Sequence, residues 1–324
     1  MPPKKHPSIE NITRHSETYR PQFRWAFLSP RFWMLWLVLF LLGLLSVLPW
    51  RLRSVLAWPL GRLLYFVSRK RRRIARLNLK WCFPKLAENE RRRWVKKHFY
   101  WRIRIAFDYG IFWWGSAKRI QRLVRVEGLM HFKQCYEQQK PIILLSCHCL
   151  ALDVGGTVLA IDYPVVSLVK AARNPLADWL LQRGRLRFNA VLYQRTGGMA
   201  PAVRAMRKGL FFYYLPDEDL GGDESVFAPF FGVNAATLAT LGRLTTLCRA
   251  SVIPSYTRYV EGKGYYVNTL SPPLTEFPRP TVQEDAQCMN QELERMILTD
   301  LTQYMWTMKR FKRRPDNAKS PYDI

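Results

Sequence analysis

The sequence predicts an α/β fold in which helices flank a mixed sheet, preceded by an N-terminal membrane-anchoring helix. Two patterns support this prediction. Apolar strands alternate with helical segments from residue 124 onward, and an uncharged apolar run occupies residues 32–48. With 324 residues the chain is long enough to bury a sizeable core. Its formal net charge of +27 is extreme for an ordinary soluble enzyme and indicates anionic partners.

The net charge does not by itself select a partner. Nucleic acid, phosphorylated lipids, a lipid headgroup surface and an acidic carrier protein are all attracted by the same Coulomb interaction. Nucleic acid is the least favoured, because no zinc knuckle, RNP-like strand or helix-turn-helix pattern accompanies the basic cluster at 69–73. Six cysteines without paired spacing argue against a disulfide framework and indicate a reducing compartment.

The apolar run follows a polar tail, residues 1–31, and has arginines on both sides. As a helix with a rise of ~1.5 Å per residue it reaches roughly 25 Å, slightly less than the hydrocarbon thickness of a bilayer. Residues 32–50 are therefore predicted to span the membrane or to anchor deeply in it. A cleaved signal peptide is disfavoured because no small-residue cleavage site follows, and a buried core helix is disfavoured because the run is apolar all round.

Residues 51–122 are predicted to form a basic, amphipathic, helical region that faces the membrane. In 51–84, arginines alternate with large apolar residues, which is typical of an interfacial helix whose arginines meet lipid phosphates. The alternative is a solvated basic helix packed on the domain. Lysine and arginine are denser after the apolar run than before it, which favours a cytoplasmic location for the large C-terminal part.

Residues 123–315 are predicted to form the catalytic domain, followed by a short tail, 316–324. The final helix of this domain is predicted at about 283 to 309, and two late strands are expected to join through Gly262 to Gly264. Before these, strands and helices alternate along the chain as RVEG (strand), a helix, 141–146 (strand), YPVVSLVK (strand), NPLADWLLQRGRLRF (helix), AVLYQR (strand), PAVRAMRKG (helix) and LFFYYLPDED (strand).

His148 stands out among five histidines because it alone directly follows a buried strand. A zinc site is disfavoured, since Cys147, His148 and Cys149 are consecutive, their side chains alternate across a strand, and no second Cys/His group completes the site. The same geometry disfavours a cysteine nucleophile activated by the adjacent ring. These points leave a general base or a satisfied core histidine.

The general-base interpretation uses the aspartate five residues after His148. If a helix starts near Cys149, Asp153 lies in its first turn, where the carboxylate can accept a hydrogen bond from one ring nitrogen. The other nitrogen is then free to take a proton, and the helix N-terminus keeps the ring neutral. The H-x-x-x-x-D spacing is a weak motif taken alone, so the neighbouring residues carry the interpretation further.

Several blocks around this motif are distinctive: VEGLMHF before it, NPLADWLLQRGRLR after it, then YYLPDED, SVFAPFFG and QYMWTMKRFKRRP. With these blocks the chain resembles the late acyltransferases of lipid A biosynthesis, the lauroyl/myristoyl transferases of Gram-negative inner membranes, within the lysophospholipid acyltransferase superfamily. The resemblance runs from residue 71 to residue 315. It implies an acyltransferase-type αβα sandwich at the inner membrane, with its catalytic domain facing the cytoplasm.

The resemblance also implies a reaction. A fatty acyl chain of about twelve to fourteen carbons moves from a thioester on acyl carrier protein to a hydroxyl group of a lipid A precursor of the Kdo2-lipid IVA type. His148, oriented by Asp153, is expected to act as the base, and Arg185 to stabilise the oxyanion. Asp217 is expected to organise an arginine or a substrate hydroxyl. No metal or other cofactor is expected, because the thioester is already activated.

The remaining residues implied by the resemblance bind substrate. Lys170 and Arg195 are expected to hold phosphate or sugar groups, and Asp219 belongs to the acidic turn in YYLPDED. Phe227, Phe230 and Phe231 are expected to line the acyl channel. Each has a structural alternative: a solvated basic face for the arginines, a turn cap for Asp217 and ordinary core for the phenylalanines.

Two other functions stay open at this stage. The first is acylation of another lysophospholipid, an ornithine lipid or another glycolipid by the same chemistry. The second is an inert membrane protein that binds acyl carrier protein or anionic lipid. The C-terminal block QYMWTMKRFKRRP favours the lipid A enzymes over the glycerolipid ones.

Overall fold

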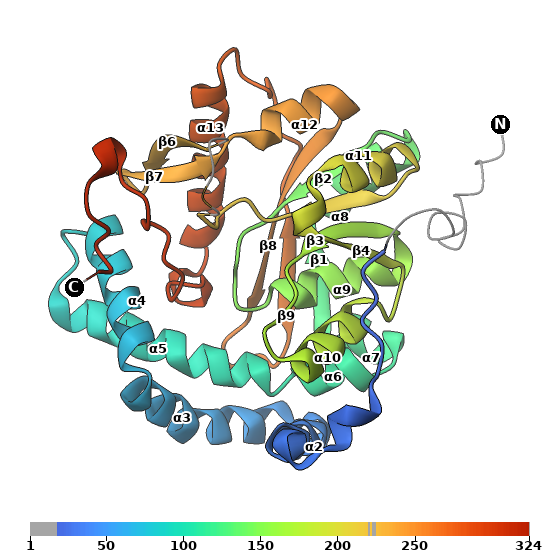
Figure 1. The fold of residues 1–324 in the computed structure, drawn as a ribbon, viewed down its shortest axis with the longest axis vertical. Helices are drawn as coiled ribbons and strands as arrows, with labels where there is room; N and C mark the ends of the chain where they lie inside the picture. Colours follow the sequence, from blue (N-terminus) through green and yellow to red (C-terminus); the bar gives the residue numbers. More distant parts are fainter. Residues whose placement is uncertain (1–17, 220, 222–224, 324) are drawn as a thin grey trace.

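The computed structural model describes residues 18–219, 221 and 225–323, which fold around a seven-stranded mixed sheet (Figure 1). The strand order is β1-β9-β8-β2-β5-β3-β4. Neighbouring strands are parallel except for β8 and β9, which are antiparallel and joined through Gly262 and Gly264. The strands are β1 (Val124–Glu127), β2 (Ile142–Leu145), β3 (Val165–Val169), β4 (Ala190–Gln194), β5 (Phe211–Tyr214), β8 (Ser251–Tyr259) and β9 (Tyr266–Leu270).

Helices cover both faces of this sheet, as the sequence predicts. Helices α8 (Leu129–Glu137) and α9 (Leu152–Asp162) pack on one face, and α11 (Ala200–Arg207), α12 (Thr240–Cys248) and α13 (Val282–Leu298) lie over the other. Alternate residues of β2 therefore enter different cores, Ile142 and Leu144 in one and Ile143 and Leu145 in the other. All four residues of β2 are apolar because helices cover both faces of the sheet.

Helix α10 (Pro175–Arg185) begins where the sequence predicts. The side chain of Asn174 accepts hydrogen bonds from the backbone N–H groups of Leu176 and Ala177, and Pro175 occupies the first helical position. Asparagine caps and proline at this position are both typical helix starts.

A separate antiparallel hairpin, β6 (Ser225–Phe230) and β7 (Val233–Leu238), packs against α13. Its two-residue turn holds Phe231 at φ 48° and Gly232 at φ 76°. A tight hairpin turn with both central residues in the left-handed region matches the twist of the strands, which explains the glycine.

The predicted final helix is too long. Helix α13 ends at Leu298, and Asp300 is extended, with φ −158°, while its side chain accepts a hydrogen bond from the backbone N–H of Thr302. Such a local bond competes with helix continuation. After a 3-10 turn, η4 (Leu301–Gln303), the chain reaches the loop that follows β2, where Tyr304 forms an isolated antiparallel bridge with Cys149.

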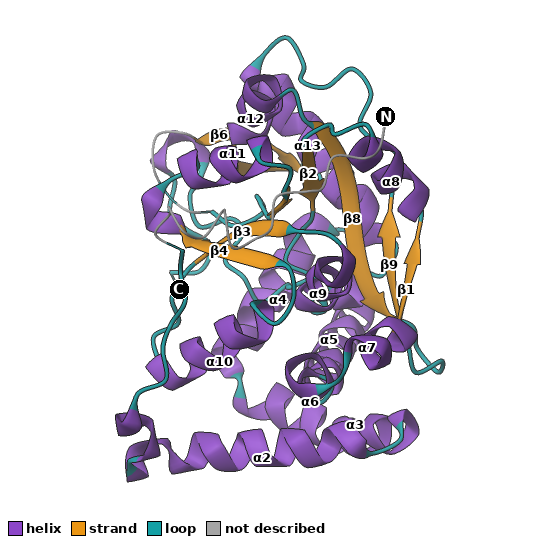
Figure 2. Cartoon of the chain, turned by 90° about the vertical axis from the view of Figure 1, so that its right-hand side faces the viewer, coloured by secondary structure: helices purple, strands orange, loops and turns teal. Residues whose placement is uncertain are grey.

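The predicted helical region 51–122 lies beneath and beside the sheet. Figures 1 and 2 show α2 and α3 along the bottom of the molecule, below α5 and α6. The elements are η1 (Trp25–Leu28), η2 (Pro30–Phe32), α2 (Trp33–Val47), α3 (Trp50–Val67), α4 (Arg69–Cys82), α5 (Glu88–Ala106), α6 (Tyr109–Trp114) and α7 (Ala117–Leu123), and the remaining 3-10 turns are η3 (Arg195–Gly197) and η5 (Pro315–Asn317). Of the predicted polar tail, residues 1–17 lie outside the described residues.

Candidate active site

His148 lies in the loop between β2 and α9, at the carboxyl end of a central strand of the sheet. The C-terminal segment holds this loop in place. The backbone N–H of Leu150 donates to the carbonyl of Gln303 at 2.8 Å, and the N–H of Met305 donates to the carbonyl of His148 at 2.9 Å. The block QYMWTMKRFKRRP thus shapes the site through its backbone. Ligand sites in open α/β sheets commonly lie beyond the carboxyl ends of the strands.

Asp217, which follows β5, is the partner of the His148 ring. Its Oδ1 lies 2.7 Å from Nδ1 of the ring, and its Oδ2 accepts from the backbone N–H of the same residue at 2.9 Å. The Asp217 side chain is fully buried, whereas 27% of the His148 side chain is exposed. In the described part of the chain the other ring nitrogen, Nε2, has no hydrogen-bond partner. The ring is therefore fixed at one nitrogen and available at the other.

The pair has opposite pKa shifts. Burial alone would lower the pKa of His148, but the charge of Asp217 and the hydrogen bond to it outweigh burial, so the pKa of the ring is raised. Burial would likewise raise the pKa of Asp217, but His148 outweighs it and the pKa of this carboxyl is lowered. Asp217 is therefore ionised, Nδ1–H of the ring donates to it, and the ring is a stronger base than free imidazole.

The cysteines on either side of the ring are not nucleophiles. Burial raises the pKa of Cys149 to about 12 and raises that of Cys147 well above its usual range. Both thiols stay protonated at neutral pH, and the reactive form of a cysteine is the thiolate.

The structure corrects the prediction that Asp153 orients His148. Helix α9 starts at Leu152, because the preceding loop follows the segment 303–305 before it turns into the helix. Asp153, in the first turn, instead receives Nε of Arg185 at 2.8 Å on Oδ1 and Nη2 at 3.3 Å on Oδ2. The hydroxyl of Tyr109 also donates to Oδ2, at 3.1 Å. The acidic residue of the H-x-x-x-x-D motif therefore positions an arginine.

Arg185, the last residue of α10, is held in a fixed orientation. Besides its two bonds to Asp153, Nη1 donates to the side chain of Gln182 at 3.4 Å. Burial would lower the pKa of Arg185, but Asp153 raises it above its ordinary value. A guanidinium has five N–H donors, so each Nη atom keeps one for a ligand. The side chain is 29% exposed.

One cavity, with a volume of about 1060 Å³, brings the predicted polar residues together. His148, Asp153, Lys170, Arg185 and Arg195 all line it, and Asp217 contacts it only through the imidazole ring. Pockets for drug-sized ligands have volumes of ≈ 300–1,000 Å³, so this cavity is large enough for a lipid-sized group.

Three further arginines, which the sequence did not single out, also line the cavity. Arg204 and Arg207 come from α11, and Arg243 comes from α12. The spacing of Arg204 and Arg207 places them on one face of their helix, which is a signal available in the sequence. Nothing in the sequence links Arg243 to them. The lining also includes Glu218, whose Oε2 pairs with Nη1 of Arg195 at 2.9 Å. Among the described residues of the lining, six cations therefore face two carboxylates.

Most of the remaining cavity wall is apolar, with Thr157, Ser167 and Thr240 among the hydroxyl-bearing exceptions, and it follows both faces of β3. Val165 and Val169 line it from the face covered by α9, and Leu168 lines it from the opposite face. Helices add further side chains, among them Leu152, Ala160, Val203, Leu244 and Leu247.

Four predicted substrate-binding residues do not line this cavity. The ring of Phe230 is fully buried between Phe231 and Phe311, and the ring of Phe231 packs on Phe83 and Trp306. Because the hairpin turns these rings toward α13 and the C-terminal segment, they form core.

The other two predicted residues also have structural partners. Phe227 lies on β6 and its carbonyl accepts from the side chain of Gln283 at 2.6 Å. The carboxylate of Asp219 is occupied by Arg313, which donates from its backbone N–H at 2.9 Å and from Nε at 2.8 Å. These contacts place both residues outside the cavity wall.

Comparison with known proteins identifies the family of the chain. A family model described as bacterial lipid A biosynthesis acyltransferase matches residues 20–313. The chain belongs to this family. As a member of the lipid A acyltransferase family it is an acyltransferase, and the resemblance found in the sequence is confirmed.

Curated members of the family align with nearly the whole chain. A lipid A biosynthesis acyltransferase of Haemophilus influenzae is 36% identical, covering 92% of this chain and 93% of that protein. The lipid A biosynthesis lauroyltransferase of Escherichia coli is 34% identical, covering 94% of this chain and 100% of that protein. The lipid A biosynthesis myristoyltransferase of Escherichia coli is 29% identical, covering 95% of this chain and 96% of that protein.

A solved structure was also matched. The 1-acyl-sn-glycerophosphate acyltransferase of Thermotoga maritima has a TM-score of 0.37 and 13% identity, covering 78% of this chain and 97% of that chain. This likeness is too low to bear on substrate. The names of the curated relatives differ in the acyl group, lauroyl in one and myristoyl in another.

Proposed function

We propose that this member of the lipid A acyltransferase family transfers a lauroyl- or myristoyl-length chain from acyl carrier protein to a hydroxyl group of a lipid A precursor of the Kdo2-lipid IVA type. The observation that carries the proposal is the His148–Asp217 pair, whose free ring nitrogen belongs to a residue lining a large cavity that is both cationic and apolar. This combination suits a base that works on an anionic lipid.

In the proposed step, Nε2 of His148 takes the proton of the acceptor hydroxyl as its oxygen attacks the thioester carbon. A new C–O bond forms and the carbonyl oxygen becomes an oxyanion. The remaining N–H groups of Arg185, held by Asp153, stabilise this charge. The C–S bond then breaks, and the carrier thiolate leaves with the proton from the imidazolium. Asp217 keeps the ring in the tautomer that this step needs, and a positioned base contributes ~10²–10⁴-fold in rate.

The charges of the cavity support a phosphorylated acceptor. Arginine forks bind phosphate in a bidentate manner, and Arg204, Arg207 and Arg243 line the same cavity as His148. The apolar wall suits the acyl chains of donor and acceptor. The overall positive charge also suits acyl carrier protein, an acidic partner, because complementary charge raises the rate of encounter.

We place the protein at the cytoplasmic face of the bacterial inner membrane. Residues Pro30–Val47 are strongly apolar, and only 17% of this stretch is buried in the protein. An uncovered apolar helix needs a lipid environment, and a membrane-bound acceptor lipid then lies close to the cavity.

The test uses purified protein with acyl carrier protein charged with lauroyl or myristoyl chains and Kdo2-lipid IVA, with products read by mass spectrometry. We expect a mass gain of one acyl unit, lost in His148→Ala. His131→Ala is the matched control, because His131 lies on α8 outside the cavity wall, and it should keep the activity. Acylation of lysophosphatidic acid alone would move the protein to another acceptor class, and no transfer to either acceptor would contradict the proposal.

A further inference from the structure

Helices α2 and α3 form a continuous apolar layer on the outside of the molecule, which we call the α2–α3 layer. Its most exposed side chains include Met34 and Val47 on α2, each 72% exposed, and Val55 on α3, 68% exposed. Figures 1 and 2, at right angles to each other, show both helices in the same layer at the bottom of the molecule.

The chain before α2 is attached to the catalytic domain. The backbone N–H of Tyr19 donates to the carbonyl of Leu192 on β4 at 2.7 Å, and the hydroxyl of Tyr19 donates to Asp178 of α10. The ring of Phe27, 3% exposed, packs against Trp179 of the same helix with centroids 6.3 Å apart. The N-terminal end of α2 is therefore fixed to the side of the sheet that carries β4.

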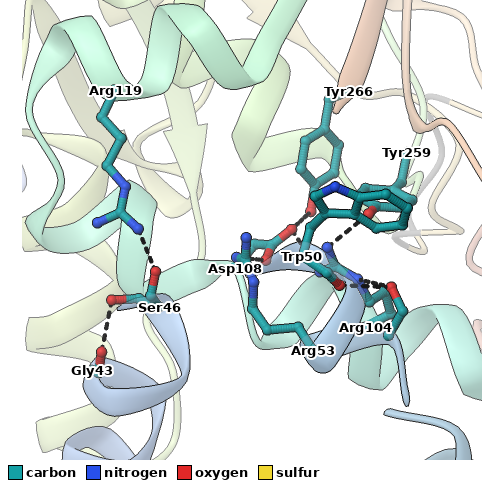
Figure 3. Close-up of polar contacts among 10 residues, drawn as sticks. Gly43, Ser46, Trp50, Arg53, Arg104, Asp108, Arg119, Tyr259 and Tyr266 are labelled. Atoms are coloured by element: carbon teal, nitrogen blue, oxygen red, sulfur yellow. Dashed lines mark hydrogen bonds and ion pairs between the residues drawn. The ribbon is translucent and has the colours of Figure 1, made fainter. Parts of the chain in front are cut away.

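The C-terminal half of α2 is fixed to the same domain. A Cβ atom at Gly110 would lie 2.6 Å from the carbonyl oxygen of Leu42 and 2.8 Å from Cβ of Ser46, so α6 and α2 pack at a distance that only glycine allows. The guanidinium of Arg119 donates to the carbonyl oxygen of Ser46 (Figure 3). Helix α6 packs on α10, and α7 packs on α9 and β1, so both ends of α2 are attached to the domain that carries His148.

Helix α3 is held by a buried ionic cluster. Figure 3 shows Arg53 of α3 paired with Asp108. Asp108 also forms an ion pair with Nη1 of Arg104 at 2.7 Å and accepts a hydrogen bond from the hydroxyl of Tyr266 at 2.7 Å. Arg53 is 5% exposed, and Arg104 and Asp108 are fully buried. A charge taken out of water in this way is stable only with its partners present, so α3 is a fixed part of the domain surface.

The α2–α3 layer also carries arginines beside aromatic rings. Arg31 lies over Phe32 at 4.7 Å from the ring centroid, and Arg62 lies over Trp58 at 4.5 Å. Both arginines are exposed. Arginine and tryptophan at the border of an apolar surface are typical of residues at the level of lipid headgroups, and their charge complements anionic lipid.

We infer that α2 does not cross the bilayer, and that the α2–α3 layer lies in the plane of the membrane within the leaflet that faces the catalytic domain. A span requires the two ends of a helix on opposite sides of a hydrocarbon core ≈ 30 Å thick, whereas both ends of α2 are bonded to one domain. The fifteen residues of α2 reach only about 22 Å at ~1.5 Å each. The inference rests on the membrane location in the proposed function.

The sidedness of residue 20 tests this inference. Arg20 and Lys140 are both exposed, and Lys140 lies on the catalytic domain between α8 and β2. Arg20→Cys and Lys140→Cys are made singly in the full-length protein and labelled with a membrane-impermeant maleimide in right-side-out and inside-out vesicles, with the parent protein subtracting the native thiols. We expect both positions to react from the same side. Labelling of residue 20 from the side opposite to residue 140 would overturn the inference.

Immersion depth gives an independent readout. Spin labels are placed singly at Met34, Leu41 and Val47 of α2 and at Val55 and Leu63 of α3, all exposed side chains. We expect similar, shallow depths at the five positions. A maximum at Leu41 with shallow values at Met34 and Val47 would indicate a span and refute the inference while leaving the acyltransfer activity intact. Failure of the protein to bind vesicles containing anionic lipid would instead remove the membrane location itself.

Discussion

Replacing Asp217 by asparagine tests the assignment of the acidic partner to the base. The wild-type carboxylate accepts two hydrogen bonds from one residue, from Nδ1–H and from the backbone N–H of His148. An asparagine of the same shape replaces these two accepting oxygens by one oxygen that accepts and one NH2 group that can only donate. If its oxygen keeps the backbone bond, its NH2 group faces Nδ1 and can donate to it only when Nδ1 carries no proton. The ring proton then moves to Nε2, the nitrogen that the reaction needs free.

The expected loss follows from this change of tautomer. An aspartate-to-asparagine change with the same effect in a serine protease triad lowers kcat by ≈ 10⁴. We expect a loss of the same order in this protein, equivalent to about 5 kcal/mol in the activation free energy. Burial strengthens the expectation, because Asp217 is 0% exposed and water cannot replace the lost acceptor.

The assay is the initial rate of acyl transfer to Kdo2-lipid IVA with saturating acyl carrier protein. Asp219→Asn is the matched control, since it makes the same change two residues later in a carboxylate that binds Arg313. Asp153→Asn is the second comparison, because Asp153 bonds to Arg185 and not to the ring. An Asp217→Asn protein that is folded by circular dichroism and retains a tenth or more of the rate would refute the role given to Asp217.

Three further predictions follow from the same contacts. Because Asp217 raises the pKa of His148, kcat/KM should fall tenfold per pH unit below a pKa higher than that of free histidine, and a profile with no such limb would exclude His148 as the base. Arg204→Ala should raise KM for the phosphorylated acceptor by roughly 10–100-fold with kcat little changed, since a hydrogen bond to a charged group contributes ≈ 1.5–3 kcal/mol. The control is Arg249→Ala, because Arg249 is exposed and lies outside the cavity wall. Equal KM values for the Arg204→Ala and parent proteins would remove Arg204 from the acceptor site. Burial lowers the pKa of His98 to about 3, whereas the pKa of a histidine in the unfolded chain is about 6.5. Between these two pH values the unfolded chain binds one more proton than the folded protein. The free energy of unfolding should therefore fall by about 1.4 kcal/mol per pH unit as the pH drops through this window. A His98→Gln protein should lose that slope in denaturant titrations, and an unchanged slope would contradict the assignment.

Local signals in the sequence predict the parts of the fold that depend on neighbouring residues. The start of α10 is one example, because Asn174 and Pro175 act on the N–H groups next to them. The strands before His148 and around Val166 are another, since covered parallel strands are apolar throughout. The choice of His148 among the five histidines also needed only the buried strand before it.

The sequence-based predictions that the structure corrects are those that depend on contacts between residues far apart in the chain. The partner of His148 depends on where segment 303–305 pins the loop, and no spacing within residues 144–156 contains that information. The helix predicted to continue to residue 309 fails at Asp300, whose side chain binds the backbone two residues later. A phenylalanine-rich strand such as SVFAPFFG has the same sequence pattern whether its rings line an acyl channel or fill a core. Phe230 could therefore be assigned to the core only from its neighbours in space.

The attachment of the His148 loop to residues 303–305 has a consequence for biosynthesis. A ribosome makes residue 148 and its acidic partner at 217 well before it makes Gln303 and Met305, and domains fold as their segments emerge. The β2 strand can be complete while the loop after it still lacks the backbone partners of Leu150 and the carbonyl of His148. A nascent chain therefore carries both members of the pair without the geometry that makes them work together, and the catalytic loop is assembled only when the last segment docks.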